Sequence, residues 1–220
     1  MADTIKVAVA GSEGRMGSTV CAAVEAAPDM ELVGSADPSA GTGLEDALAG
    51  ADVLVDFTVP DSAVENARTA ASAGVDVVIG TTGFDPAELE GIEGSKILVA
   101  PNFAIGAVLM MKFAEEAASR FPSAEIVELH HEKKVDAPSG TAALTAERME
   151  DGLGSRPQIH SVRLPGVVAS QEVILGGPGE TLTIRHDTID RECFMPGVLL
   201  AIRKVGGLER SPVVGLENLL

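Results

Sequence analysis

The sequence predicts an α/β protein in which a doubly wound parallel sheet is followed by a second, α+β domain with an antiparallel or mixed sheet. In the first part of the chain, short apolar runs alternate with segments of helical periodicity, as in parallel sheets covered by helices. After Asn102 the strands follow one another across short turns, which favours antiparallel or mixed pairing. Aromatic residues make up only 3% of the chain, so the core is aliphatic, as is common in parallel α/β folds.

The first part of the chain contains the expected parallel sheet. Apolar runs bounded by turn residues predict strands at residues 5–10, 31–36, 53–58, 75–79 and 97–100. Helical periodicity predicts helices at residues 18–27 and 62–73, the first of which stops at Pro28.

The second part begins with a long helix at residues 105–120. A further helix is expected at residues 141–149, and strands at residues 124–130, 159–163, 171–175 and 181–187. A last helix is expected at residues 195–205. We therefore place a first domain at residues 1–103, to which residues 193–220 return, and a second domain at residues 104–192.

Charge and composition exclude several classes of function. The net charge of −17 disfavours binding to nucleic acid and to anionic membranes, because both need clustered Lys and Arg. This acidity fits ordinary solubility and also a salt-adapted cytoplasm. We find no apolar run of bilayer-spanning length and no signal-peptide pattern, so we expect a cytoplasmic protein. Cys21 and Cys193 are expected to be buried, inert thiols.

A glycine-rich turn follows the first strand. Gly11, Gly14 and Gly17 recur at every third position between a strand and a helix, where small residues let the backbone approach a pyrophosphate. The turn departs from the usual dinucleotide fingerprint, because Glu13 stands where a second glycine is expected. Asp37 ends the next strand, where a carboxylate can bind the ribose hydroxyls of an adenosine. The alternative is a tight strand–helix turn without a ligand.

Asp37 also bears on the choice of cofactor. A carboxylate repels the 2′-phosphate of NADPH, and its neighbour is Pro38 rather than an arginine. Only Arg15 lies near enough in sequence to contact that phosphate. We therefore expect NADH to be used at least as well as NADPH.

Two further loops follow predicted strands of the parallel sheet. One is Gly80-Thr81-Thr82-Gly83, and the other is Ala100-Pro101-Asn102-Phe103. Ligands of open parallel sheets bind beyond the carboxyl ends of the strands, where both loops lie. Their hydroxyl and amide groups suit a ribose or a nicotinamide, although such tetrapeptides in isolation are more often ordinary turns.

The most informative segment is residues 128–142, in the predicted second domain. His130 and His131 are adjacent there, and Lys133 and Lys134 follow closely. Histidine can donate a proton near neutral pH, which the reduction of a C=C or C=N bond requires, and lysine can bind a carboxylate. Ser139-Gly140-Thr141 opens a helix whose N–H groups can hold a second carboxylate. The segment predicts a site for a small dicarboxylate beside a hydride donor; the alternative is a solvated, charged loop. We expect no metal.

The same segment resembles the signature of the 4-hydroxy-tetrahydrodipicolinate reductase (dihydrodipicolinate reductase) family. In that signature paired histidines, a lysine and Asp-Ala-Pro-Ser-Gly-Thr-Ala occur in this order, as they do here from His130 to Ala142. The resemblance covers nearly the whole chain. It includes Gly-Arg-Met-Gly, Val-Asp-Phe-Thr, Gly-Thr-Thr-Gly and Ala-Pro-Asn-Phe, and the strands through Arg163 and Gly179-Glu180. The chain is shorter than typical members around residues 38–50 and 149–159.

The resemblance implies an oxidoreductase that reduces 4-hydroxy-tetrahydrodipicolinate to tetrahydrodipicolinate with NADH or NADPH, on the diaminopimelate route to lysine. By matching positions, His130 is implied to be the general acid and Lys134 a carboxylate ligand or proton donor. His131, Gly140 and Thr141 are implied to bind the substrate, whereas Lys133 matches no functional position. The implied cofactor residues are Gly11, Ser12, Glu13, Gly14, Arg15, Met16, Asp37, Gly80, Thr81, Thr82, Ala100, Pro101, Asn102 and Phe103.

Family members pair a Rossmann domain with an open mixed sheet that builds a homotetramer, so the resemblance implies this architecture and assembly. The sequence disfavours two other functions. A different Rossmann reductase, such as an aspartate-semialdehyde dehydrogenase, needs a nucleophilic cysteine, and neither Cys21 nor Cys193 has an activating sequence context. A nucleotide-sensing regulator needs a DNA-binding module and a basic patch, and the sequence shows neither.

Overall fold

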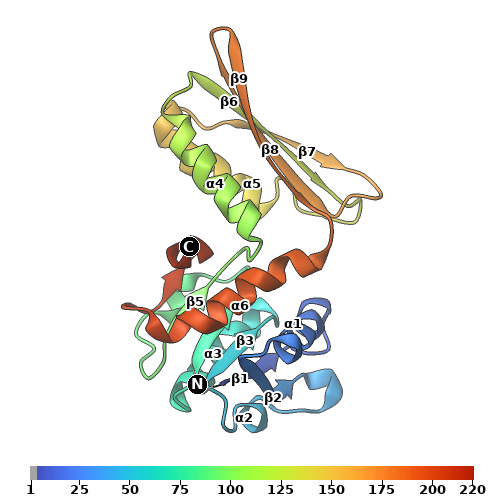
Figure 1. Cartoon of the computed structure of the whole chain (residues 1–220), viewed down its shortest axis with the longest axis vertical. Helices are drawn as coiled ribbons and strands as arrows, with labels where there is room; N and C mark the ends of the chain where they lie inside the picture. Colours follow the sequence, from blue (N-terminus) through green and yellow to red (C-terminus); the bar gives the residue numbers. More distant parts are fainter. Residues whose placement is uncertain (1–3) are drawn as a thin grey trace. The chain divides into compact units, whose positions relative to one another are not determined.

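The computed structural model describes residues 4–220 and divides the chain into two compact units. Unit 1 is formed by Met1–Phe103 with Phe194–Leu220, and unit 2 by Ala104–Cys193 (Figure 1). Residues 1–3, which the predicted first domain includes, lie outside the described residues. Within residues 4–220, no helix combines the length and the apolar character needed to cross a bilayer.

Unit 1 is built on a six-stranded parallel sheet with the strand order β10-β5-β4-β3-β1-β2. From β1 the chain first moves outward to β2 and then returns to β3 on the other side of β1. The loops after β1 and β3 therefore diverge at the position where ligands bind in doubly wound folds. The strands are β1 (Ile5–Ala10), β2 (Met30–Ala36), β3 (Val53–Asp56), β4 (Asp76–Ile79), β5 (Ile97–Val99) and β10 (Val213–Val214).

Helices cover both faces of this sheet, which explains why its central strands are apolar on both sides. On one face Leu54 and Ile79 belong to a buried cluster with three alanines of α3 (Pro60–Ser72). Side chains that alternate with these, such as Val9 and Val55, are equally buried on the other face. There α1 (Arg15–Ala26) packs on β1 and against α6 (Met195–Lys204). The short α2 (Leu44–Ala47) packs on β2.

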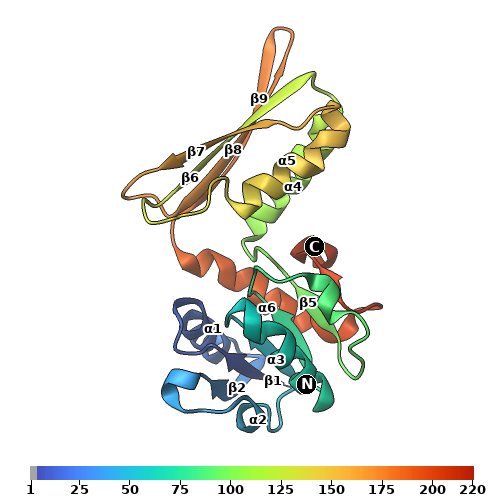
Figure 2. The ribbon, with the colours of Figure 1, turned by 180° about the vertical axis from the view of Figure 1, so that it is seen from behind.

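Unit 2 contains a four-stranded mixed sheet with the order β7-β6-β8-β9. The strands are β6 (Ser123–His130), β7 (Gln158–Arg163), β8 (Ala169–Gly177) and β9 (Glu180–Thr188). The β6–β7 pair is parallel, and the other two pairs are antiparallel. Two helices, α4 (Ile105–Ala118) and α5 (Gly140–Leu153), lie on the same face of this sheet (Figures 1 and 2).

The covered face of this sheet fixes the orientation of β6. Ala124 and Ile126 belong to a buried cluster with residues of α4 and α5. Because side chains on a strand alternate between the two faces, Glu128 and His130 continue the same row toward the end of the strand. Glu128 is 0% exposed, so a carboxylate occupies a position that the pattern of β6 otherwise gives to apolar residues.

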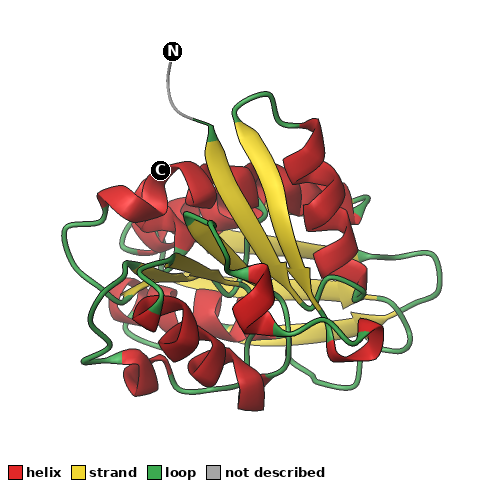
Figure 3. Ribbon diagram, turned by 90° about the horizontal axis from the view of Figure 1, so that it is seen from below, coloured by secondary structure: helices red, strands yellow, loops and turns green. Residues whose placement is uncertain are grey.

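The elements follow the predicted order, with small differences in extent; the loops between them are green in Figure 3. Helix α5 runs four residues past the predicted end, because it stops only at Gly154, whose left-handed conformation lets its N–H bond the carbonyl of Glu150. Strand β8 extends through Gly177, so the turn before β9 is reduced to Pro178 and Gly179. The short helix α2 and strand β10 were not predicted, because four and two residues carry no clear periodicity.

Candidate functional site

The glycine turn after β1 brings the first turn of α1 close to the sheet. Gly11 has φ +78°, and a Cβ on it would lie 2.6 Å from the carbonyl oxygen of Phe57. A Cβ on Gly17 would lie only 2.0 Å from the carbonyl oxygen of Gly11. Gly14 is the N-cap of α1, and no side chain of the described chain caps this helix. The exposed N–H groups of such a helix end can bind an anion.

Asp37, at the end of β2, supports this turn directly. Its Oδ2 accepts the backbone N–H of Glu13 at 3.1 Å, and its Oδ1 accepts the N–H and the hydroxyl of Ser39 at 2.9 and 2.6 Å. These hydrogen bonds, first that of the Ser39 hydroxyl, lower the pKa of Asp37. A charged carboxylate therefore lies beside the glycine turn, and it binds the residue that replaces the usual second glycine.

A second buried carboxylate, Asp56, joins the loops after β3 and β4. Its Oδ1 accepts the backbone N–H and the hydroxyl of Thr58 at 3.0 and 2.8 Å, and also the hydroxyl of Thr81 at 2.8 Å. Its Oδ2 accepts the amide of Asn66 at 2.7 Å. Of the two predicted cofactor threonines, Thr81 is buried and its hydroxyl donates to Asp56, whereas Thr82 is exposed to solvent.

Phe57 holds the loops after β4 and β5 together in unit 1. A Cβ on Gly80 would lie 2.1 Å from its ring, and its ring centroid lies 5.7 Å from that of Phe103. Ala100 and Phe103 are buried, so Pro101 and Asn102 are the partly or fully exposed side chains of the predicted Ala-Pro-Asn-Phe loop. The predicted cofactor residues of unit 1 therefore cluster at the carboxyl ends of the strands, around a ring whose role the sequence did not reveal.

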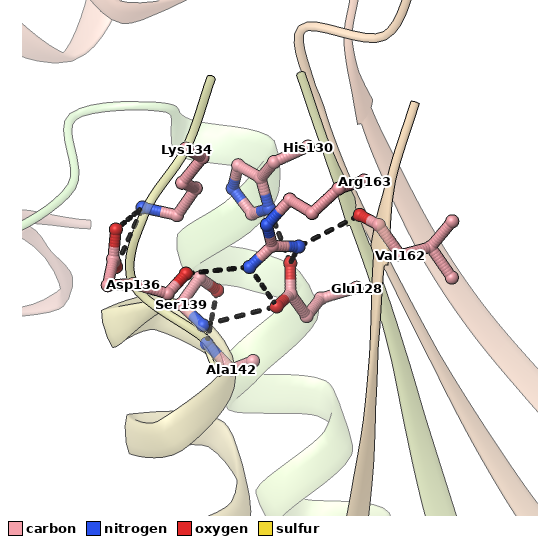
Figure 4. A network of polar contacts seen from close by, with 8 residues as sticks. All are labelled: Glu128, His130, Lys134, Asp136, Ser139, Ala142, Val162 and Arg163. Atoms are coloured by element: carbon pink, nitrogen blue, oxygen red, sulfur yellow. Dashed lines mark hydrogen bonds and ion pairs between the residues drawn. The ribbon is translucent and has the colours of Figure 1, made fainter. Parts of the chain in front are cut away.

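In unit 2 the predicted acid, His130, lies against Glu128 (Figure 4). Its Nδ1 is hydrogen-bonded to Oε2 of Glu128, two residues earlier on β6. The guanidinium of Arg163 donates from Nη1 to Oε2 and from Nη2 to Oε1 of the same carboxylate, both at 2.9 Å. The backbone N–H of Ser139 donates to Oε1 at 3.3 Å. One buried carboxylate thus joins β6, β7 and the start of α5.

The charges around His130 set its protonation. Burial alone would raise the pKa of Glu128, but hydrogen bonds from Arg163, Ser161 and His130 outweigh it and lower this pKa to about 2. The pKa of His130 lies below its usual value, because burial lowers it most and the positive charges of Lys134 and Arg163 lower it further, whereas the contact with Glu128 raises it. Glu128 is therefore ionised at neutral pH, and it accepts the proton on Nδ1 of the imidazole. The second ring nitrogen, Nε2, points toward the side on which Lys134 lies (Figure 4).

Lys134 lies in the loop after β6, and its ammonium pairs with Asp136 at 2.8 Å. The backbone carbonyl of Asp136 accepts Nη2 of Arg163 at 2.7 Å, so this loop is tied to the same guanidinium. The Lys134 side chain is 21% exposed, within reach of a ligand carboxylate from solvent. His131 is half-buried in the preceding turn, and Lys133 is exposed.

Helix α5 begins where the second carboxylate site is predicted. Ser139 is its N-cap, and the Ser139 hydroxyl accepts the N–H of Ala142 at 3.2 Å. Gly140 has open space where a Cβ would lie, and Thr141 is half-buried. The start of the helix therefore leaves room for an anion beside its N–H groups. The structure brings His130, Lys134 and this helix end together in unit 2.

Sequence reasoning missed Glu128 and Arg163 as members of the site. The available signal was a glutamate in the apolar row of β6, because a charged side chain on a buried face needs a partner. The prediction of buried thiols was also wrong, since both Cys21 and Cys193 are only half-buried. Partial burial still raises the pKa of each thiol. Among residues 4–220 no cluster of His, Cys, Asp or Glu is arranged to hold a metal ion.

Solved structures share the architecture of the chain. A dipicolinate-bound dihydrodipicolinate reductase from Paenisporosarcina sp. TG-14 superimposes with a TM-score of 0.89 at 37% identity, covering 99% of this chain and 100% of that one. The protein GenD2 from gentamicin A biosynthesis, solved in complex with NAD, matches with a TM-score of 0.66 at 14% identity, covering 100% of this chain and 91% of that one. This second likeness shows the fold alone.

Sequence comparisons agree along the whole chain. A protein of Cutibacterium acnes named 4-hydroxy-tetrahydrodipicolinate reductase is 51% identical, with 98% of each chain covered. A protein of Nocardia farcinica with the same name is 47% identical, with 99% of each chain covered. The family models described as dihydrodipicolinate reductase N-terminus and C-terminus match residues 5–103 and 106–220. The predicted resemblance is confirmed, and the chain belongs to the dihydrodipicolinate reductase family.

Proposed function

We propose that this chain reduces 4-hydroxy-tetrahydrodipicolinate to tetrahydrodipicolinate with NADH or NADPH, on the diaminopimelate route to lysine. The observation that carries the proposal is the arrangement of His130, Lys134 and the start of α5 around the buried Glu128 carboxylate. It joins a proton donor to two sites that suit carboxylates. Relatives that carry this enzyme's name over their whole length, and a structural neighbour bound to the dicarboxylate dipicolinate, support the same substrate class.

Unit 1 is the cofactor-binding part in this proposal. A reduced nicotinamide nucleotide supplies the hydride when bound. The uncapped start of α1 suits a pyrophosphate, and the carboxylate of Asp37 suits the hydroxyls of a ribose. The loops after β4 and β5 would complete the site. The proposed cofactor residues are Gly11, Ser12, Glu13, Gly14, Arg15, Met16, Asp37, Gly80, Thr81, Thr82, Ala100, Pro101, Asn102 and Phe103.

Unit 2 binds the two carboxylates of the substrate. Lys134 exchanges its partner Asp136 for one carboxylate, and the N–H groups of Gly140 and Thr141 at the start of α5 hold the other. His131 contacts the substrate from the turn after β6. Both carboxylates are held by positive charge or by the positive end of a helix, so electron density is drawn from the ring that accepts the hydride.

His130 supplies the proton. Overall, the 4-hydroxyl group and a hydrogen of the neighbouring ring carbon leave as water, and one hydride and one proton are added to the same two ring carbons. His130 donates from Nε2 in its doubly protonated imidazolium form, because its Nδ1 proton is shared with Glu128. After donation the neutral imidazole keeps its Nδ1 hydrogen bond, so the ring stays in place until a proton from solvent restores it.

We further propose a homotetramer that acts in the cytoplasm. Within unit 2, α4 and α5 both lie on one face of the mixed sheet, which leaves the opposite face open in this part of the described chain (Figure 2). Ionic groups such as Arg185 and Glu172, paired at 2.8 Å, lie on that face. An open sheet face of this kind suits association with the same face of a second copy.

The test is a coupled assay. A dihydrodipicolinate synthase generates the substrate in place, and the oxidation of NADH or NADPH is followed after addition of the chain. We expect oxidation only when synthase, its substrates and the chain are all present. Tight binding of NADH without oxidation in the complete mixture would reject the proposal. Oxidation of cofactor with aspartate semialdehyde alone would point instead to a different reductase.

A further inference from the structure

We infer that Glu128 is a positioning residue, which holds the imidazole of His130 by Nδ1 and fixes it relative to the start of α5. The inference rests on the proposed function, in which His130 donates the proton and α5 holds a substrate carboxylate. It assigns a role to a side chain that is 0% exposed and acts through other residues.

The contacts of Glu128 exceed those of a simple ion pair. Arg163 alone occupies both carboxylate oxygens with a two-point contact, which suffices to neutralise the buried charge. Oε2 nevertheless also binds Nδ1 of His130, and Oε1 also binds the N–H of Ser139. Each oxygen thus joins Arg163 to one part of the proposed substrate site. A purely structural pair would need neither additional contact.

The hydrogen bonds of Glu128 connect the two parts of the proposed substrate site, His130 and the start of α5. His130 ends β6, and Ser139 caps α5 nine positions further on, after an exposed loop. Apart from Glu128, the acid and the helix end are connected by that loop and by the apolar packing of α5 on β6, which does not fix the orientation of the imidazole. Through Glu128 they are joined by two hydrogen bonds to one carboxylate that is 0% exposed. Arg163 also donates to the carbonyl of Asp136, which ties the middle of the loop to the same carboxylate.

The contact also fixes which nitrogen of His130 can act. A carboxylate that accepts the proton on Nδ1 holds the ring in one tautomer and leaves Nε2 as the atom that exchanges a proton with the ligand. The charged groups that face this ring are Glu128 on β6, Lys134 and Asp136 in the following loop, and Arg163 on β7. Of these, the Glu128 carboxylate raises the pKa of His130, while Lys134 and Arg163 lower it. Removal of the Glu128 charge therefore lowers this pKa.

Glu128→Gln in the full chain tests the inference. We expect kcat to fall by about 10- to 100-fold, at or below the lower limit of the range of about 10²–10⁴ that a positioned proton donor contributes, because His130 itself is retained. The basic limb of the kcat/KM profile should move to lower pH, because His130 loses its proton earlier. The dissociation constant of NADH should not change. Gln171→Leu is the matched control, because Gln171 is buried beside Glu128 in the sheet but bonds Thr145 rather than His130. It should leave the pH profile unchanged.

A double variant separates positioning from a general loss of structure. If Glu128 acts through His130, Glu128→Gln should lower kcat less than about twofold in a His130→Gln background. Equal losses in both backgrounds, or an unshifted pH profile, would overturn the inference. If Glu128→Gln does not fold, the double variant Glu128→Met/Arg163→Met takes its place in the same comparison of backgrounds. It removes both charges of the ion pair, so that neither is left buried without a partner.

One readout does not depend on the reaction. The pKa of the His130 imidazole can be followed by NMR in the wild type and in Glu128→Gln, with Gln171→Leu as the control. We expect it to be lower in Glu128→Gln only. A lower imidazole pKa in Glu128→Gln, in a chain without reductase activity, would support the role of Glu128 and reject the proposed function. Reductase activity together with an unchanged imidazole pKa would support the proposed function and reject the role of Glu128.

Discussion

Arg163 on β7 binds both carboxylate oxygens of Glu128 on β6, with two N–O distances of 2.9 Å. The two residues lie 35 positions apart in the sequence and meet because β6 and β7 pair in parallel, with His130 opposite Arg163. Glu128 is 0% exposed and the Arg163 side chain 19% exposed. One ion pair therefore joins β6 to β7 within unit 2 at the carboxylate that also contacts His130.

Arg163→Met should destabilise the chain strongly, because it leaves the buried Glu128 charge without its main partner. Loss of one member of a buried pair typically costs about 3–5 kcal/mol, and we expect about 3 kcal/mol here because Arg163 is partly exposed. The free energy of unfolding in urea measures this. Glu128→Met/Arg163→Met is the control, since removal of both charges should recover most of the stability but not the activity. A double variant as unstable as the single one would contradict this account.

The same pair makes stability depend on pH in the acidic range. Folding lowers the pKa of Glu128 from 4.5 to about 2, so its ionised form stabilises the folded state above pH 4.5. That stabilisation is lost as the pH falls from 4.5 to about 2. The unfolding free energy of the wild type should therefore fall more steeply over this window than that of Glu128→Gln.

A comparison with Glu128→Gln isolates this contribution. Hydrogen bonds from Arg185 and Ser170 lower the pKa of Asp187 to about 2 as well, so Asp187 titrates in the same window. It is present in both proteins, and its contribution cancels in the difference between the two curves. Parallel curves from pH 4.5 to 2 would show that Glu128 does not gain its stabilisation from ionisation.

The sequence predicted those parts of the fold and site that local patterns encode. Gly14 and Gly17 are favoured by their close approach to the carbonyl oxygen of Gly11 in the same turn, and Gly11 by its φ of +78°, so the spacing of the three indicates the strand–turn–helix. His130, Lys134 and the start of α5 lie within a dozen residues of one another, so their combination was visible before any pairing was known. Helix α5 was predicted too short, because the left-handed Gly154 that ends it gives only a weak signal.

Features that depend on strand register could not be predicted in this way. The contact of Glu128 with Arg163 requires β7 to pair with β6 in one particular alignment, and no local pattern specifies that alignment. The ring of Phe57 contacts Gly80 and Phe103 only because three strands of unit 1 end at the same edge. The hydrogen bond from the Thr81 hydroxyl to the buried Asp56 likewise follows from the pairing of β3 with β4.

His130→Gln should lower kcat by about 10²- to 10⁴-fold, because glutamine cannot supply the proton. The affinity for NADH should stay close to that of the wild type, since the proposed cofactor residues all lie in unit 1. Lys134→Ala should instead raise the KM of the substrate and lower kcat, because it removes a carboxylate ligand. Steady-state kinetics in the coupled assay and NADH titration measure both effects. Unchanged turnover in His130→Gln would remove the proposed acid.

Gly17→Ala should destabilise unit 1 and weaken NADH binding together. The added Cβ would lie 2.0 Å from the carbonyl oxygen of Gly11, so α1 has to move away from the turn that its N-terminus shares with the cofactor site. Overpacking of this kind costs about 1–3 kcal/mol. Gly207→Ala is the control, because a Cβ there meets nothing within 4 Å, and its effect should stay within about 0.5 kcal/mol. Equal stability of the two variants would contradict the close packing of α1.

Asp37→Asn should shift cofactor preference toward NADPH. The carboxylate of Asp37 stays ionised, because the hydroxyl and N–H of Ser39 and the N–H of Glu13 stabilise its charge, and a charge at this position repels a 2′-phosphate. Asparagine removes the charge, but its amide nitrogen cannot accept the N–H of Glu13. The loss of that hydrogen bond loosens the glycine turn and weakens the binding of both cofactors alike. The loss of charge favours the binding of NADPH only.

The ratio of the two cofactors therefore separates these effects. We expect kcat/KM to fall for NADH and to fall less, or rise, for NADPH. The ratio of kcat/KM with NADH to kcat/KM with NADPH should decrease by about tenfold, which corresponds to the removal of about 1.4 kcal/mol of repulsion. Ser39→Ala is the matched control: it removes one hydrogen bond to the carboxylate at 2.6 Å but keeps the charge, so the ratio should not change. Equal losses for both cofactors in Asp37→Asn would mean that Asp37 only supports the turn. A wild type that strongly prefers NADPH would show that the negative charge does not determine the choice.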